Sequence, residues 1–198
     1  MSTAAGTYDK VADGMNLLTV DQIIREQPDE TPSTALAIPR ALGATRYDAA
    51  LVSPVAETHT LTEQLAVLFR RADYSITVMR CPAPQEPQPA CDALDQARTC
   101  LVVVPDKVRV DSQWLWWILG RATATTRRQA VIPVTRRDSA RPLTEFRPAL
   151  PQPLKELPYL GRSRAVGEKH DSLWVAPPGA ALSTREAINL EYWIYDRG

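Results

Sequence analysis

The chain has 198 residues, of which 44% are hydrophobic and 23% are charged, and its formal net charge is zero. This length and composition are typical of a globular protein with one sizeable hydrophobic core. A zero net charge gives no overall attraction to nucleic acid or to an anionic membrane, so neither is an expected partner.

The cysteines and the hydropathy pattern exclude further classes of protein. The three cysteines, Cys81, Cys91 and Cys100, are too few and too scattered for a disulfide framework or a structural zinc site, so no metal is expected. No stretch approaches the roughly 18 apolar residues of a membrane helix. Residues 1–14 lack the basic and apolar regions of a signal peptide. We therefore expect a cytoplasmic protein.

Residues 1–45 are interpreted as an N-terminal extension, either partly disordered or docked as a strap on the rest of the chain. Within this extension, Thr19 and Gln22 have the spacing of a capping box at the start of a short helix. Pro28 would end that helix. The main domain is expected to span residues 46–198.

Strands and helices are expected to alternate along residues 46–198. The predicted strands are short apolar or β-branched runs at 47–53, 75–80, 99–104, 130–134 and 172–176. The predicted helices carry apolar residues at helical spacing and lie at 60–72, 91–98, 111–125 and 185–195. This alternation predicts a three-layer α/β fold, with a five-stranded parallel sheet and helices on both faces. Residues 136–170 are expected to be largely irregular.

Two segments are candidates for contact with a protein partner. Residues 82–89 form a stiff, proline-rich loop that includes Pro84 and Pro87. The helix at 111–125 carries three tryptophans. We expect Trp114 and Trp117, which lie three residues apart, to share the face that packs on the core. Trp116 would then be exposed and available to a partner.

Common nucleotide and hydrolase motifs are missing from the loop after the first strand. The loop from Ser53 to Glu57 contains neither the GxGxxG fingerprint nor a Walker A sequence. Ser53 does not lie in a GxSxG turn, and the chain has only two histidines, His59 and His170. A Ser-His-Asp triad is therefore poorly supported.

Several segments contain short sequence motifs that follow one another in a recognisable order along the chain. They are residues 47–53, 93–104, 112–117, 132–134, 173–175 and 190–194. The first begins Tyr-Asp and ends in Ser, and the third begins Ser-Gln-Trp. In this order the segments resemble the Toll/interleukin-1 receptor (TIR) domain over about residues 46–196. The resemblance implies a flavodoxin-like fold.

The resemblance also implies two functional classes. Some TIR domains cleave NAD at the nicotinamide–ribosyl bond or cyclise its ADP-ribose part, whereas others are signalling modules, some in immune defence, that assemble through TIR–TIR contacts. The enzymes use a glutamate six residues beyond the serine of Ser-x-Trp, and Ile118 occupies that position here. A carboxylate supports an oxocarbenium-like transition state, which an isoleucine cannot do. A non-catalytic signalling or interaction module, which requires no cofactor, is therefore the leading expectation.

Two enzymatic alternatives remain open. One is an NAD glycohydrolase or ADP-ribosyl cyclase with a displaced carboxylate, for which Glu57 and Glu63 are the candidates. The other is an enzyme similar to nucleoside deoxyribosyltransferases, which also need a carboxylate near the strand ends. In open sheets ligands bind beyond the carboxyl ends of the strands, and a helix start near Ser112 favours anions. A pocket for NAD or a related nucleotide would therefore include Ser53, Pro54, Glu57, Asp106, Ser112, Trp114 and Ile118.

Overall fold

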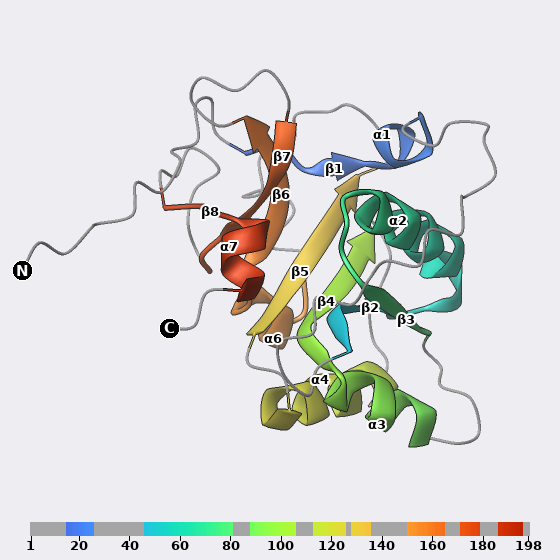
Figure 1. The fold of residues 1–198 in the computed structure, drawn as a ribbon. Coiled ribbons are helices and arrows are strands. Elements are labelled where there is room, and N and C mark those ends of the chain that lie inside the picture. Colours follow the sequence, from blue (N-terminus) through green and yellow to red (C-terminus); the bar gives the residue numbers. More distant parts are fainter. Residues whose placement is uncertain are drawn as a thin grey trace, which may run out of the picture.

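The computed structural model describes residues 15–25, 46–80, 88–105, 113–125, 128–135, 150–164, 171–178 and 186–195. These residues form an α/β fold around one open sheet of eight strands (Figure 1). The strands are β1 (Leu18–Thr19), β2 (Tyr47–Ser53), β3 (Ile76–Arg80), β4 (Ala97–Pro105), β5 (Arg128–Thr135), β6 (Tyr159–Arg164), β7 (Asp171–Ala176) and β8 (Ile188–Asn189). The helices are α1 (Val20–Arg25), the short 3-10 helix η1 (Ala56–Thr58), α2 (His59–Arg71), α3 (Gln88–Asp95), α4 (Gln113–Thr125), α6 (Gln152–Lys155) and α7 (Leu190–Tyr195). Within these ranges, no helix is long and apolar enough to cross a membrane.

The sheet is mixed. Its main path runs in the order β3-β2-β4-β5-β6-β7-β8, and β1 pairs with β5 beside this path. Neighbouring strands from β3 to β6 pair in parallel. The pairs β6–β7 and β7–β8 are antiparallel. The predicted α/β class is thus confirmed, but the sheet is larger than five strands and is not purely parallel.

The strands and the helix of the C-terminal region differ from the prediction. The segment 172–176, predicted as the fifth parallel strand, is the antiparallel strand β7. The fifth parallel position belongs to β6, whose sequence YLGRSR has one glycine and two arginines instead of a continuous apolar run. The predicted closing helix at 185–195 is shorter, because residues 188–189 pair with β7 as strand β8.

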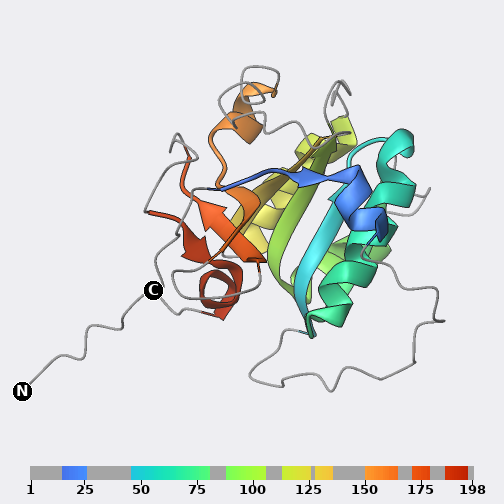
Figure 2. The ribbon, with the colours of Figure 1, turned by 90° about the horizontal axis from the view of Figure 1, so that it is seen from above.

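Helices cover both faces of the sheet (Figures 1 and 2). Each face has its own apolar cluster. Alternate residues of the central strand β4 face opposite sides, so Cys100 and Val102 join one cluster while Leu101 and Val103 join the other. The helices α3, α4 and α6 pack on the first face. The helices α1, α2 and α7 pack on the second face. These are the three layers that the alternation of strands and helices predicts.

The helix α2 forms because its sequence suits the second face. Its buried residues, Thr62, Leu65, Ala66 and Phe69, recur at three- and four-residue spacing. Arg70 and Arg71 lie in its last turn, where positive charge is favourable beside the helix dipole. The α2 helix therefore presents an apolar stripe to the sheet and a basic C-terminal end to its surroundings.

Residues 15–25, which we call the N-terminal strap, are part of the sheet. The strands β5 and β6 share the registered pair Val131–Tyr159. Three residues further along each strand, the strap pairs with both: Leu18 is in register with Val134, and Asn16 exchanges two backbone hydrogen bonds of 2.7 and 2.8 Å with Arg162. The strap therefore fills the gap that opens between β5 and β6.

The strap is also part of the hydrophobic core. Leu17 belongs to the cluster on the first face, whereas Leu18 and Ile23 belong to the cluster on the second face. The predicted capping box is confirmed, because the backbone N–H of Gln22 donates to Thr19 Oγ1 and the N–H of Thr19 donates to Gln22 Oε1, both at 3.2 Å. The remaining positions of the predicted extension lie outside the described residues.

The contact between the strap and β6 makes a testable prediction for Gly161. A Cβ atom at this position would lie 2.7 Å from Met15 Cε and 2.9 Å from the backbone oxygen of Asn16, so the strap would have to shift. We expect Gly161→Ala to lower the free energy of unfolding in urea by about 1–3 kcal/mol. The control is Gly120→Ala in α4, where nothing lies within 4 Å of the added atom. This control should raise the free energy of unfolding by about 0.5–1 kcal/mol. Equal effects of the two substitutions would contradict the docked strap.

Candidate functional site

The loop after β2 is closed by hydroxyl groups. Ser53 is fully buried, and its Oγ lies 2.5 Å from Thr58 Oγ1 and 3.2 Å from the carbonyl oxygen of Val55. The hydroxyl of Thr58 donates to the same carbonyl at 2.7 Å. Both hydroxyls are therefore engaged within the loop, which gives Ser53 a structural role at the end of its strand.

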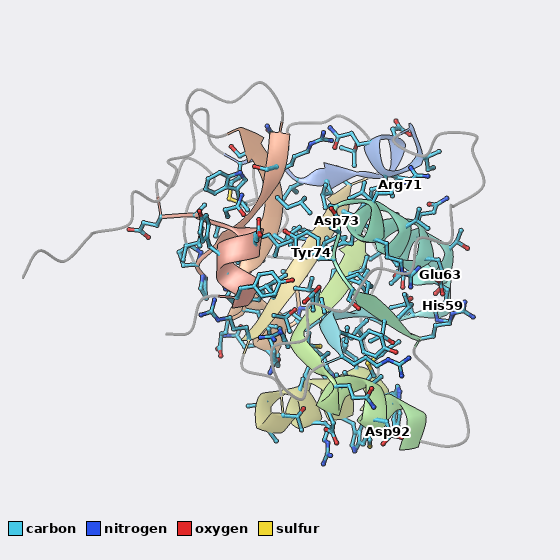
Figure 3. All side chains as sticks on the ribbon, in the orientation of Figure 1. His59, Glu63, Arg71, Asp73, Tyr74 and Asp92 are labelled. Carbon is cyan, nitrogen blue, oxygen red and sulfur yellow. The ribbon has the colours of Figure 1, made fainter. Side chains whose placement is uncertain are left out.

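The other predicted residues of this loop do not converge on a cavity in the described part of the chain. Pro54 is buried, whereas Glu57 is exposed on η1. Glu63 forms an ion pair with Arg80 at 2.7 Å, and its side chain is 41% exposed. Figure 3 shows His59 and Glu63 along the first half of α2. The two candidate carboxylates, Glu57 and Glu63, thus lie on a solvated surface.

Ile118 occupies the core. Its side chain is 0% exposed, and it belongs to the apolar cluster that α4 forms with the first face of the sheet. Together with Leu115, Leu119 and Ala122 it forms the buried stripe of α4. The position at which the resemblance would place a catalytic glutamate therefore faces the sheet among apolar side chains.

Two of the three tryptophans of α4 lie differently from the prediction, whereas Trp114 packs against the core cluster as predicted. Trp116, predicted to be exposed, is half-buried and packs against the core cluster. Trp117, predicted to be buried, is 38% exposed. The prediction for Trp116 and Trp117 was wrong because the stripe that α4 buries runs through Leu115 and Ile118, and Trp116 rather than Trp117 packs beside it.

Trp114 and Trp117 form an aromatic pair at the surface of α4. Their ring centroids lie 4.4 Å apart, and the ring planes differ by 8°, which is a stacked arrangement. Trp114 is half-buried, and its indole N–H has no hydrogen-bond partner among the residues that the structure describes. A buried donor without an acceptor is rare in native proteins and costs about 1–3 kcal/mol.

An ion pair lies beside this aromatic pair and joins α4 to α3. Arg121 Nη2 donates to both carboxylate oxygens of Asp95, at 3.1 and 2.9 Å. The hydrogen bond to Asp95 raises the pKa of the Arg121 guanidinium. Trp117 and Arg121 are four residues apart and therefore share one side of the helix. We call Trp114, Trp117, Arg121 and Asp95 the α4 surface. Asp92, labelled in Figure 3, marks the adjoining helix α3.

Four predicted site residues lie outside the described residues. They are Asp106 and Ser112 of the predicted nucleotide pocket, and Pro84 and Pro87 of the predicted contact loop. In the described part of the chain, no group of three His, Cys, Asp or Glu side chains could hold a metal ion. The described predicted residues therefore lie in two places. One is the hydrogen-bonded loop after Ser53, and the other is the largely apolar helix α4 around Ile118.

A cleft of about 440 Å³ lies elsewhere in the molecule. It is lined by residues from β1, α2, β6, β7, β8 and α7 and by the turn after α2, and we call it the α2–α7 cleft. None of the predicted site residues lines this cleft. Its lining comes from segments far apart in the chain, and β6 and β8 were themselves missed, so no local pattern in the sequence could indicate it.

In comparisons with known proteins, no protein-family model matches this sequence, and no curated protein matches it.

The burial of Ile118 makes a second testable prediction. Ile118→Glu places a carboxylate in an apolar cluster, and we expect it to lower the free energy of unfolding at pH 7 by about 3–5 kcal/mol. Ile118→Val, the control, should cost about 0.5–1.5 kcal/mol.

The same variant should show a distinctive pH dependence. Burial raises the pKa of the new Glu in the folded state, so the variant should lose stability relative to Ile118→Val as the pH rises above the unfolded pKa of about 4.3. Urea unfolding at pH 4 and pH 7 measures this difference. Wild-type stability of Ile118→Glu at pH 7 would mean that the position is open to solvent.

Proposed function

We propose that this chain is a non-catalytic protein-interaction module of the TIR type. The observation that carries the proposal is the complete burial of Ile118. An NAD-cleaving TIR domain needs a carboxylate that reaches the ribose from this position, whereas here the side chain packs on the sheet. The packing of Ile118 among its apolar neighbours supports a role for α4 in stabilising the fold and in contacting another protein, instead of in catalysis.

The order of the parallel strands supports the finer part of this proposal. Counted from β2, the path β3-β2-β4-β5-β6 corresponds to the order 2-1-3-4-5, which is one of the two common orders of doubly wound sheets. We propose that these five strands are a flavodoxin-like core of the TIR type. The strands β1, β7 and β8 would then be additions to that core.

The α4 surface is the proposed contact site. Trp117 takes the role that the sequence suggested for Trp116, because it is the more exposed of the two. Aromatic and arginine side chains contribute most to the affinity of protein interfaces, and this surface holds both kinds. Pro84 and Pro87 remain predicted contacts.

We propose a second copy of the chain as the partner that is tested first. The α4 surface contains an acid, a base and apolar rings, so two copies can offer complementary groups to each other. Self-association also agrees with the assembly of signalling TIR domains through TIR–TIR contacts. No cofactor is required for this function.

The first test of this function is enzymatic. Purified protein incubated with NAD should release no nicotinamide, as followed by chromatography, because Ile118 occupies the glutamate position and the candidates Glu57 and Glu63 lie on a solvated surface. Release of nicotinamide would favour the glycohydrolase or cyclase alternative. Glu57→Gln and Glu63→Gln would then identify the displaced carboxylate, since loss of turnover in only one of them would assign the role.

The second test measures self-association by size-exclusion chromatography with light scattering over a range of concentrations. We expect the wild type to gain mass as its concentration rises and Trp117→Ser to remain a monomer. Trp114→Phe keeps a ring beside Trp117 and removes only an indole N–H that is buried within the monomer, so it should leave association unchanged.

The control for this test is Tyr192→Ser on α7, which removes an aromatic side chain that is 55% exposed and lies on the other face of the sheet. It should leave association unchanged. A wild type of constant monomeric mass, or a loss of association in Tyr192→Ser alone, would contradict the proposed surface.

A further inference from the structure

The α2–α7 cleft lies on the second face of the sheet, away from the α4 surface. Its lining includes Leu18, which belongs to the cluster of that face, and Leu68 and Leu173, which pack against it. A volume of about 440 Å³ is within the usual range of sites for small molecules, which is about 300–1,000 Å³. The cleft can therefore hold a molecule of one or two rings.

One wall of the cleft is positioned by the end of α2. Asp73 adopts a left-handed conformation with φ of 64°. Its N–H donates to the carbonyl of Arg70, and the N–H of Tyr74 donates to the carbonyl of Phe69, both at 3.1 Å. These two bonds form a Schellman motif, which turns the chain sharply after the helix.

Tyr74 is directed by this motif into the lining of the cleft. Figure 3 shows Arg71, Asp73 and Tyr74 together at the end of α2 nearest α7. The Tyr74 ring packs on Phe69 with a centroid distance of 5.8 Å and an interplanar angle of 55°. Because both the backbone turn and this ring contact hold it, Tyr74 offers a preorganised surface to a flat apolar ligand.

The charges around the cleft favour an anion. Among the described residues that line it, Arg71 from α2 and Arg162 from β6 are accompanied by one carboxylate, that of Glu191 from α7. All three residues also take part in other interactions within the chain, so a ligand would bind beside or in place of existing contacts. Two guanidinium groups can donate several charge-assisted hydrogen bonds to a carboxylate or a phosphate.

We infer that the α2–α7 cleft binds a small aromatic anion, a ring that carries a carboxylate or a phosphate group. The ring lies against Tyr74 and the apolar residues Leu68 and Leu173, and the anionic group faces Arg71 and Arg162. This inference goes beyond the proposed interaction function and does not depend on it, because the two sites use opposite faces of the sheet.

The experiment uses probes of matched shape on the full chain. Benzoate and benzamidine are planar molecules of similar size with opposite charge, and phenyl phosphate and inorganic phosphate differ by the ring. Binding is followed by amide chemical-shift changes in NMR spectra. We expect benzoate or phenyl phosphate to shift the signals of Tyr74 and Leu173 with a Kd on the order of 1 mM, which is typical of such small molecules. Benzamidine should not shift them, and inorganic phosphate should bind more weakly than phenyl phosphate.

Substitutions that remove single charges then test which residues face the anionic group, because removing a positive or a negative charge should change the affinity in opposite directions. Arg71→Gln should weaken binding of the aromatic anion about tenfold, because it removes a charge-assisted hydrogen bond. Glu191→Gln should strengthen binding about threefold, because it removes the repelling carboxylate. The control is Arg80→Gln, which makes the same charge change at an exposed position outside the cleft and should leave the Kd unchanged within about twofold.

Several outcomes would overturn the inference. One is the absence of shifts with both aromatic anions at about 10 mM on a folded protein. Another is preferential binding of benzamidine. Equal affinity for inorganic phosphate and phenyl phosphate would overturn the contact of the ring with Tyr74. An equal loss of binding in Arg80→Gln and Arg71→Gln would show that only the net charge of the protein matters.

Discussion

The strands β5 and β6 diverge after one registered pair, and the molecule depends on how the resulting gap is closed. Backbone N–H and C=O groups inside a protein need partners, and those in this gap are paired by the N-terminal strap. Leu17 and Leu18 then point to opposite faces and enter both apolar clusters. The strap thereby joins the parallel part of the sheet to the antiparallel part formed by β6, β7 and β8. The absence of a side chain at Gly161 leaves the space that this contact occupies.

The two faces of the sheet have different chemical characters. On the first face, α4 packs through aliphatic residues, with Trp114 and Trp116 against the same cluster and Trp117 more exposed. On the second face, α2 and α7 stand apart and leave a cleft bordered by arginines. At the carboxyl end of β2, Ser53 and Thr58 bind each other and the backbone. The candidate catalytic carboxylates Glu57 and Glu63 are solvated, and Ser53 has a structural position.

Much of the core could be predicted from the sequence because local patterns determine it. The strand 47–53 has the predicted bounds, since an apolar run between polar residues suits a strand buried on both faces. The capping box of Thr19 and Gln22 was also predictable, because it depends on residues only three positions apart. Both features need no knowledge of distant parts of the chain.

The features that escaped prediction depend on distant contacts. The strand β6 has a weak local signal and is stabilised by its neighbours β5 and β7. The burial of Trp116 and the exposure of Trp117 depend on which side of α4 meets the sheet, and two overlapping apolar faces made that choice ambiguous. The α2–α7 cleft combines residues from Leu18 to Glu191, so it exists only once the chain has folded. In the strap, a helix signal was visible at Thr19, but the pairing with β5 was not.

The position of the strap has a consequence for any shortened form of this protein. Removing residues 1–45 would leave the backbone of Val134 and Arg162 without the partners that Leu18 and Asn16 now supply. Unpaired strand edges readily add a strand from another molecule, which leads to domain swapping or aggregation. Residues 15–25 thus protect the sheet against pairing with other chains, and the sheet formed by the later strands is incomplete without them.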